Sequence, residues 1–254
     1  MQTLDYSNKV VMISGAGGGM GKLAAENFAQ AGATLAICDI NQGNIEALAA
    51  RLRESGCEVF AAACDVSNEN QVKSFIESSI EAFGRIDVAI NNAGILQPLA
   101  HTHQLDLKHL DRQYEINIKG VFACMKYQIT QMKKQGSGNI LNVSSVAGLG
   151  GAPNLSAYAA SKHAVIGITR SSAVEYGRYG IRVNAICPSH VDSPMMDSVE
   201  DTTPITKDQI AAANPMKRLA TMQEIVNAML WTCSDFNSYM NGHALAIDGG
   251  LTAI

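Results

Sequence analysis

The stretch 14-SGAGGGMGKLAAENFAQAGA-33 carries five glycines between Gly15 and Gly21 and then continues as a helical pattern. Glycine loses more conformational entropy on folding than any other residue, so this concentration needs a structural reason. The stretch follows Val10–Ser14, an apolar run typical of a strand. A glycine loop between a first strand and a first helix lets the backbone approach a pyrophosphate at the helix N-terminus. We therefore expect a dinucleotide phosphate site here.

The spacing of these glycines fits two motif registers. Gly19, Gly21 and Ala24 fit G-x-G-x-x-G/A, whereas Gly15, Gly19 and Gly21 fit the wider G-x-x-x-G-x-G. The residues alone leave both registers open. They also leave the two remaining glycines of the loop without a role.

Outside this stretch, short apolar runs alternate with helical patterns along the whole chain. The expected strands are Val10–Ser14, Leu35–Cys38, Val59–Ala63, Asp87–Ile90, Asn139–Val143, Arg182–Ile186 and His243–Ala246. The expected helices are Lys22–Ala31, Gln42–Glu54, Glu69–Phe83, Asp106–Lys134, Leu155–Tyr176 and Met222–Ser234. Such alternation indicates parallel strands joined by right-handed helical crossovers. The pattern predicts a single Rossmann-type α/β domain over residues 1–254, a doubly wound parallel sheet of about seven strands with helices on both faces.

The composition argues against several kinds of partner. The chain of 254 residues is 47% hydrophobic and has a formal net charge of −4 without a block of Lys and Arg, so no nucleic-acid partner is expected. No apolar run approaches the roughly 18 residues of a membrane span, and the start MQTLDYSNK lacks the features of a secretory signal. The six scattered cysteines form no CxxC pair, which favours reduced thiols over disulfides or a metal site. We expect a cytoplasmic protein without a bound metal.

The least regular segment is Pro188–Pro215, which is rich in Ser, Asp, Thr and Pro. A solvated loop is one interpretation, but a structureless segment of this length in a compact domain is more often functional. We therefore expect a flexible substrate flap at about residues 188–215. Within it, Met195 and Met196 could line an adaptable apolar pocket or simply pack beneath the flap, and both interpretations stay open.

Carboxylates follow two of the expected strands. Asp39 lies 18 residues after Gly21, where a carboxylate can accept hydrogen bonds from the ribose of NAD and repel the extra phosphate of NADP. The alternative role for Asp39 is to cap the next helix. The glycine loop offers no basic side chain for a 2′-phosphate, so NAD is predicted over NADP. Asp65 adds a carboxylate at the carboxyl edge of the sheet, where ligands bind in such folds.

Two residues of a later helix could transfer a proton. Tyr158 and Lys162 lie four apart in 158-YAASK-162 and share one helical face. Free Tyr has a pKa near 10, and a nearby ammonium lowers it, so the pair is suited to proton transfer. The hydroxyls of 143-VSSVAG-148 follow the fifth expected strand. Asn117 interrupts an apolar helical stretch, where Asn is disfavoured, and its alternative role is a buried structural side chain.

Together these residues resemble the short-chain dehydrogenase/reductase superfamily, single-domain type, over nearly the whole chain. SGAGGGMG is similar to its TGxxxGxG cofactor motif, with Ser14 in place of Thr, and 91-NNAG-94 matches its NNAG motif. The catalytic tetrad of the family is matched, in order and spacing, by Asn117, Ser145, Tyr158 and Lys162. The interval of 13 residues from Ser to Tyr selects Ser145 over Ser144.

The resemblance implies an NAD-dependent oxidoreductase that interconverts a secondary alcohol and a ketone by hydride transfer. Tyr158 would be the general acid/base, and Ser145 would hydrogen-bond the reacting oxygen. Lys162 would bind the nicotinamide ribose and lower the pKa of Tyr158, while Asn117 would hold a water in a proton relay. The implied cofactor contacts are Gly15, Gly19, Met20, Gly21, Asp39, Asp65, Val66, Asn91, Ala93, Gly94, Tyr158, Lys162, Pro188, Val191 and Ser193.

The chain departs from the family pattern at 188-PSHVDS-193, where Pro-Gly is usually followed by a Val and a Thr. Ser189 replaces the Gly and puts the usual backbone geometry in doubt, whereas Ser193 keeps a hydroxyl in place of the Thr. The candidate substrate contacts are Leu96, His190, Met195 and Met196. His101 and His103 lie two apart in a loop without an obvious third ligand, so a metal pair is not expected there.

Two other functions stay open. One is reduction of 3-oxoacyl thioesters, a common activity in the family. Asp39 argues against this activity where NADPH is the reductant. The other is a non-catalytic dinucleotide sensor on the same fold. Because family members are commonly tetramers and the end 243-HALAIDGGLTAI-254 is apolar, we expect a homotetramer with a small-molecule alcohol or ketone as substrate. The sequence does not identify that substrate.

Overall fold

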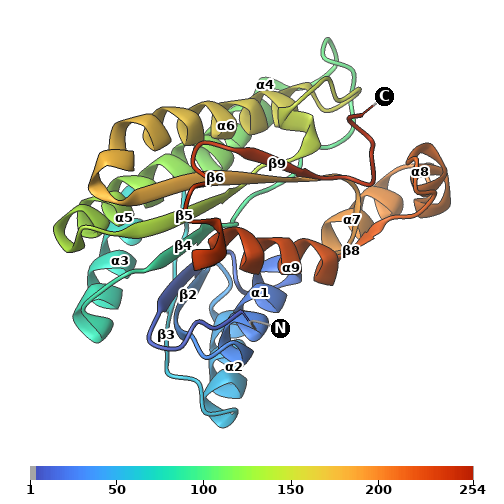
Figure 1. The fold of residues 1–254 in the computed structure, drawn as a ribbon. Helices are drawn as coiled ribbons and strands as arrows, with labels where there is room; N and C mark the ends of the chain where they lie inside the picture. Colours follow the sequence, from blue (N-terminus) through green and yellow to red (C-terminus); the bar gives the residue numbers. More distant parts are fainter. Residues whose placement is uncertain (1–3, 254) are drawn as a thin grey trace.

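The computed structural model describes residues 4–253, and its centre is a parallel sheet of seven strands in the order β3-β2-β1-β4-β5-β6-β9 (Figure 1). The strands are β1 (Val10–Ser14), β2 (Thr34–Asp39), β3 (Val59–Ala63), β4 (Val88–Asn91), β5 (Gly138–Val143), β6 (Ile181–Pro188) and β9 (Ala244–Ile247). The order reverses between β1 and β4, which is the switch point where ligands bind in doubly wound sheets. The predicted fold class is confirmed.

Helices cover both faces of this sheet. One face packs against α1 (Gly19–Gln30), α2 (Gln42–Glu54) and α9 (Met222–Cys233), and the other against α3 (Glu69–Phe83), α5 (Val121–Gln135) and α6 (Ser156–Tyr176). Successive strand residues point to opposite faces of the sheet, so Ile13 packs in the core beneath α1, α2 and α9, and Met12 packs in the core beneath α3, α5 and α6. Burial on both faces is the reason that the strands are nearly continuous apolar runs. Residues 4–253 also contain three 3-10 turns, namely η2 (Val146–Gly148), η3 (Gly177–Tyr179) and η4 (Asp235–Asn237).

The long helix expected over Asp106–Lys134 is divided into three parts. It comprises α4 (Leu107–Gln113), a π-helical segment η1 (Tyr114–Gly120) and α5. Asn117 lies in the middle of the π-helical segment. A π turn widens the helix and re-aims its side chains, and such turns occur frequently at functional sites. The polar residue that interrupted the apolar pattern therefore marks a change of helix type.

The segment 188–215 is not structureless, contrary to the interpretation of its composition, and its expected role as a substrate flap stays a prediction. This segment contains a short strand β7 (Val191–Asp192) paired with β8 (Ala220–Thr221), and two helices, α7 (Pro194–Thr202) and α8 (Lys207–Ala213). Proline at the first position of α7 and a capping box at the start of α8 favour these helices locally. Figure 1 shows α7 and α8, in orange, grouped beside the sheet. Lys207 holds the group together, because its Nζ lies 2.7 Å from an Asp192 carboxylate oxygen and 2.5 Å from one of Asp197.

Within residues 4–253, no helix has the length and apolar character that crossing a bilayer requires. All six cysteines are free thiols, and all except Cys57 are buried.

Candidate active site

The glycine loop after β1 is held against the end of β4. Asn92 Nδ2 donates to the carbonyl oxygens of Ser14 (3.2 Å) and Gly15 (2.9 Å). A Cβ on Gly21 would lie 2.1 Å from the Gly15 carbonyl oxygen, so α1 packs against the loop at a distance that no other residue permits. No side chain caps α1, whose N-cap is Gly18. The first amides of α1 therefore remain available to an anionic group, as a phosphate site requires.

Asp39 lies directly on this loop. Its Oδ2 accepts from the Gly17 amide at 2.8 Å, and its Oδ1 accepts from the Asn41 amide at 2.8 Å. A Cβ on Gly17 would lie 2.6 Å from the carboxylate carbon, so this glycine leaves room for Asp39. The N-cap of α2 is Asn41, whose side chain accepts from Asn44, so the alternative that Asp39 caps this helix is wrong.

The asparagine side chains of the NNAG segment form hydrogen bonds with other parts of the protein. Asn91 Nδ2 donates to Asn142 Oδ1 (2.9 Å) and to Gln128 Oε1 (3.1 Å), below the sheet edge. The Asn91 side chain is therefore engaged inside the protein and is not turned toward a ligand. The Ser14 hydroxyl accepts from the Ala93 amide at 3.3 Å, so Ser fulfils this contact in place of Thr. The sequence prediction omitted Asn92, although its place in NNAG was a usable signal.

Three members of the predicted tetrad meet at the carboxyl edge of β5. Lys162 Nζ donates to the Val143 carbonyl at 2.8 Å and lies 5.5 Å from the centre of the Tyr158 ring. Burial raises the pKa of Tyr158 to about 12, against an opposing hydrogen bond with Ser145. Burial also lowers the pKa of Lys162 to about 8. The expected depression of the Tyr158 pKa by Lys162 is therefore absent from this structure, because desolvation of the phenol dominates.

The two serines after β5 have different environments. Ser144 is buried, and its hydroxyl donates to the Lys162 carbonyl at 2.9 Å, which fixes α6 to the sheet. Ser145 Oγ accepts from the Ala147 amide at 3.1 Å and faces Tyr158. The structure thus brings Ser145, and not Ser144, to the phenol.

Asn117 is the fourth member, and its side chain is only 1% exposed. Its Oδ1 accepts from the Ile95 amide at 2.9 Å, and its Nδ2 donates to the Ile95 carbonyl at 3.0 Å and to Ser161 Oγ at 3.1 Å. A Cβ on Gly94 would lie 3.2 Å from Asn117 Oδ1 and 3.6 Å from Lys162 Nζ. The Asn117 side chain is thus bonded within the protein, and both its oxygen and the Lys162 ammonium lie beside Gly94.

The departure from the family pattern after β6 leaves the sheet intact. The Ser189 amide donates to the Ile247 carbonyl at 3.2 Å, so β6 continues to pair with β9 at that point. The adjacent His190 has a buried Nδ1 without a hydrogen-bond partner. Burial lowers the pKa of His190, which favours the neutral imidazole at pH 7.

Helix α7 begins over the glycine loop. The Pro194 ring lies 3.9 Å from the place of a Cβ on Gly19. Ser193 donates to the Val191 carbonyl at 3.1 Å and does not cap α7. On α7, Met195 is 41% exposed and Met196 is half-buried.

The remaining predicted contacts lie around the same edge. Asp65 accepts from the Ser67 amide at 2.9 Å and from the Ser67 hydroxyl at 2.7 Å, so its carboxylate is turned toward its own loop. Val66 is buried against Gly120. Met20 and Leu96 are half-buried, and Pro188 is buried at the end of β6.

His101 and His103 are exposed, and their rings stack with centroids 5.9 Å apart. Across the described ranges, no group of three or more His, Cys, Asp or Glu side chains is arranged to hold a metal ion.

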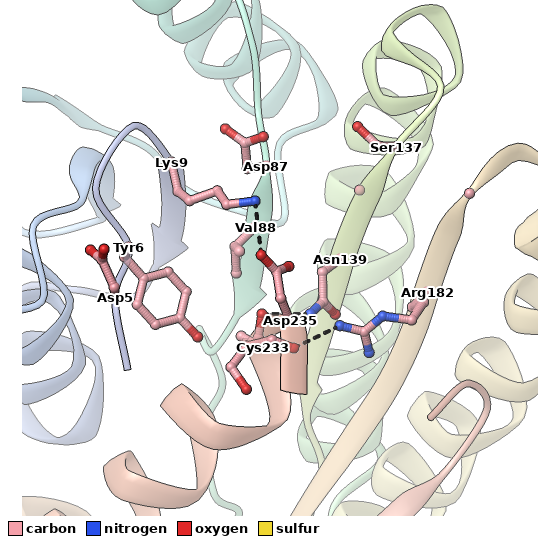
Figure 2. Close-up of a pocket in the computed structure, with 13 residues that line it drawn as sticks. Asp5, Tyr6, Lys9, Asp87, Val88, Ser137, Asn139, Arg182, Cys233 and Asp235 are labelled. Carbon is pink, nitrogen blue, oxygen red and sulfur yellow. Dashed lines mark hydrogen bonds and ion pairs between the residues drawn. The ribbon is translucent and has the colours of Figure 1, made fainter. Parts of the chain in front are cut away.

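A polar cavity of about 150 Å³ lies at the opposite, amino edge of the sheet (Figure 2). Lys9 Nζ pairs there with Asp235 at 3.4 Å, and Asn139 Nδ2 donates to the Cys233 carbonyl at 2.9 Å. Arg182 donates to the Ser234 carbonyl at 3.3 Å. No predicted site residue lines this cavity, whose contacts fasten the end of α9 to the sheet.

Comparison with known proteins agrees with this geometry. A family model described as Enoyl-(Acyl carrier protein) reductase matches residues 15–252. Levodione reductase of Leifsonia aquatica is 39% identical over 99% of this chain and 97% of its own length. A 2,5-dichloro-2,5-cyclohexadiene-1,4-diol dehydrogenase of Sphingobium indicum is 38% identical over 98% of this chain and 99% of its own length. The cis-4-hydroxycyclohexanecarboxylate dehydrogenase of Sinomonas cyclohexanicum is 37% identical over 98% of each chain.

Solved structures agree as well. The crystal structure of levodione reductase superposes with a TM-score of 0.94 at 39% identity and covers 98% of this chain and 99% of that chain. ElxO with NADP bound superposes with a TM-score of 0.90 at 31% identity, and the match covers 97% of this chain and 99% of that chain. With the glycine loop, the NNAG segment and the Ser, Tyr and Lys side chains gathered at one sheet edge, the chain belongs to the short-chain dehydrogenase/reductase family of oxidoreductases.

Proposed function

We propose that this protein is an NAD(H)-dependent oxidoreductase that interconverts a secondary alcohol on a six-membered carbon ring and the corresponding ketone. The observation that carries the proposal is the meeting of Ser145, Tyr158 and Lys162 beside a glycine loop on which Asp39 lies. The ring is suggested by two relatives, which are named for a cyclohexadienediol and a hydroxycyclohexanecarboxylate.

Tyr158 is proposed as the general acid/base. When bound, the nicotinamide supplies or accepts the hydride. In ketone reduction the Tyr158 phenol donates its proton to the developing alkoxide, and in alcohol oxidation the phenolate takes that proton. Ser145 reaches Tyr158, so its hydroxyl is placed to hydrogen-bond the same oxygen. Lys162, with a pKa of about 8, can give and receive protons near neutral pH, and it would exchange them with a water that Asn117 holds.

The cofactor preference rests on Asp39. Its carboxylate is fixed by the Gly17 and Asn41 amides, and it retains oxygen lone pairs for the ribose hydroxyls. A 2′-phosphate at this place would meet a fixed negative charge. ElxO, which is 31% identical, has NADP bound, and the preference proposed for this chain is the opposite one because of Asp39.

The 188–215 segment is proposed as the substrate flap of a single catalytic domain. Because α7 begins over the glycine loop, movement of α7 and α8 would open or cover the cofactor. Met195 and Met196 on α7, with Leu96 and the neutral His190 at the sheet edge, are the proposed substrate contacts.

A reduction screen tests the function. Purified protein should produce NADH from cyclohexanols and cyclohexanediols, and should do so more efficiently with NAD than with NADP in parallel reactions. The screen includes acyclic secondary alcohols, and 3-oxoacyl thioesters with NADPH. A higher kcat/KM for a thioester with NADPH would overturn both the substrate and the cofactor. Cofactor binding without turnover of any substrate would favour the sensor function.

Replacing Asp39 tests the cofactor preference. Asp39→Asn keeps an acceptor for one of the Gly17 and Asn41 amides and removes the charge. The NAD to NADP ratio of kcat/KM should therefore fall about tenfold or more, since 1.4 kcal/mol corresponds to a factor of ten. Asp235→Asn removes the same charge at the opposite edge of the sheet and should leave the ratio unchanged. An equal ratio in wild type and Asp39→Asn would contradict the assignment.

Replacing Tyr158 tests the proton transfer. Tyr158→Phe should lower kcat about 10²–10⁴-fold, the range of general acid/base catalysis, with little change in cofactor Kd. Because burial raises the phenol pKa to about 12, wild-type alcohol oxidation should accelerate as pH rises from neutral, while ketone reduction should not. Tyr127→Phe removes a phenol that bonds Glu69 at the surface and should behave as wild type. A Tyr158→Phe enzyme with the wild-type kcat would refute this role.

Assembly is the last part of the proposal: a cytoplasmic homotetramer. Apolar side chains stand exposed along α4, η1 and α5, namely Leu107, Leu110, Tyr114 and Phe122. Such a row suits a protein interface better than solvent. Light scattering at working concentration should give four times the mass of the 27.0 kDa chain, and a monomer mass would overturn the assignment.

A further inference from the structure

Helix α6 has no N-terminal cap of its own. It begins at Ser156, and the residue in the N-cap position, Leu155, offers no side-chain acceptor. The amides of a first helical turn have no partner within the helix and need one from elsewhere when they are buried. Tyr158 occupies the third position of this turn, so its own backbone amide is one of these groups.

The missing acceptor comes from Gln97, on the loop that follows β4. Gln97 Oε1 accepts from the Tyr158 amide at 2.8 Å. Its Nε2 donates to the Asn154 carbonyl at 3.3 Å, on the approach to α6. The Gln97 side chain is only 3% exposed, so water does not compete for these contacts. A single amide therefore performs, from 61 residues away, the role that Ser, Thr, Asp or Asn usually performs at an N-cap.

A second buried glutamine links this cap to Asn117. Gln113 precedes Asn117 by one helical turn and is 1% exposed. Its amide oxygen accepts from Asn117 Nδ2 at 2.6 Å, or, with the amide reversed, from the Gln97 backbone amide at 3.2 Å. The Asn117 side chain also bonds the amide and carbonyl of Ile95, two residues before Gln97, so the same loop carries both the cap and the partner of Asn117. Because these groups are buried, breaking any of these contacts leaves a polar atom without a partner.

We propose that Gln97 is a positioning residue that holds Tyr158 in register with the cofactor-binding loop and Asn117 by capping α6 at the Tyr158 amide. This inference rests on the proposed function, because the position of Tyr158 matters for the proton transfer. Gln97 acts through the backbone of Tyr158. Gln97 lies three residues after Gly94 on the same loop, so movement of that loop on cofactor binding would reach the phenol through this hydrogen bond.

Gln97→Met tests the proposal, since it keeps the length of the side chain and removes both hydrogen bonds. We expect kcat to fall about 10- to 100-fold, as small misplacements of catalytic groups do, with the KM for the cofactor nearly unchanged. The rise of the oxidation rate with pH should also extend to higher pH, because the hydrogen bond between Ser145 and Tyr158 opposes the burial that raises the phenol pKa. Gln97→Glu keeps an acceptor beside the helix N-terminus and should restore kcat to within about threefold of wild type.

Gln135→Met is the matched control. Gln135 also bridges backbone groups with its amide, since it accepts from the Ile86 amide at 3.1 Å and donates to the Ile86 carbonyl at 2.6 Å, but it does so at the amino edge of the sheet. The Gln135→Met substitution should lower thermal stability without changing kcat or the pH profile of alcohol oxidation. Equal kcat losses in Gln97→Met and Gln135→Met would overturn the proposal, and so would a Gln97→Glu enzyme as slow as Gln97→Met. If Gln97→Met does not fold, Gln97→Asn, which withdraws the amide by one methylene, replaces it with the same expectations.

Amide hydrogen exchange in the protein without cofactor measures directly whether the Tyr158 amide is hydrogen-bonded. The peptide containing Tyr158 should lose protection in Gln97→Met and keep it in Gln135→Met. Unchanged exchange in Gln97→Met would refute the cap whatever the activity. Conversely, lost protection in a protein that turns over no substrate would refute the proposed function and leave the cap itself standing.

Discussion

The site depends on the parallel pairing of β1 with β4. Their register sets Ser14 opposite Asn91, so the glycine loop leaves its strand beside the NNAG segment although 77 residues separate the two. The Asn92 side chain then joins the NNAG segment to the glycine loop by donating hydrogen bonds to the carbonyls of Ser14 and Gly15. Because the sheet order reverses at this pair, no strand or crossover fills the space above it. The tetrad and Asp39 are arranged around that space.

Residues that are local in sequence, or set by strand ends, could be predicted well. The alternation of apolar runs gave seven parallel strands, and Asp39 does terminate β2. The spacing from Ser145 to Tyr158 also identified the serine that faces the phenol. The first two inferences need only periodicity and the rule that the carboxyl ends of parallel strands share one edge, whereas the choice of Ser145 came from the resemblance to the family.

What escaped prediction depends on tertiary contacts or on short helices. Gln97 sits in an unremarkable loop, and its partner is 61 residues away, so no local pattern marks it as a cap. The rise of the Tyr158 pKa follows from burial that the spacing to Lys162 cannot reveal. The helices α7 and α8 were missed because the Ser, Thr and Pro content of the segment was interpreted as loop composition, although Pro194 and Thr206 begin helices.

The position of Asp39 links cofactor choice to loop shape. One carboxylate oxygen accepts from the Gly17 amide, and a Cβ on Gly17 would enter the carboxylate group itself. The charge proposed to exclude a 2′-phosphate therefore also sets the course of the glycine loop. A basic residue at position 17 would introduce a positive charge for NADP, but it would displace Asp39 at the same time. The proposed cofactor preference would thus depend on the Gly17 and Asp39 pair, and reversing it fully would require both positions to change together.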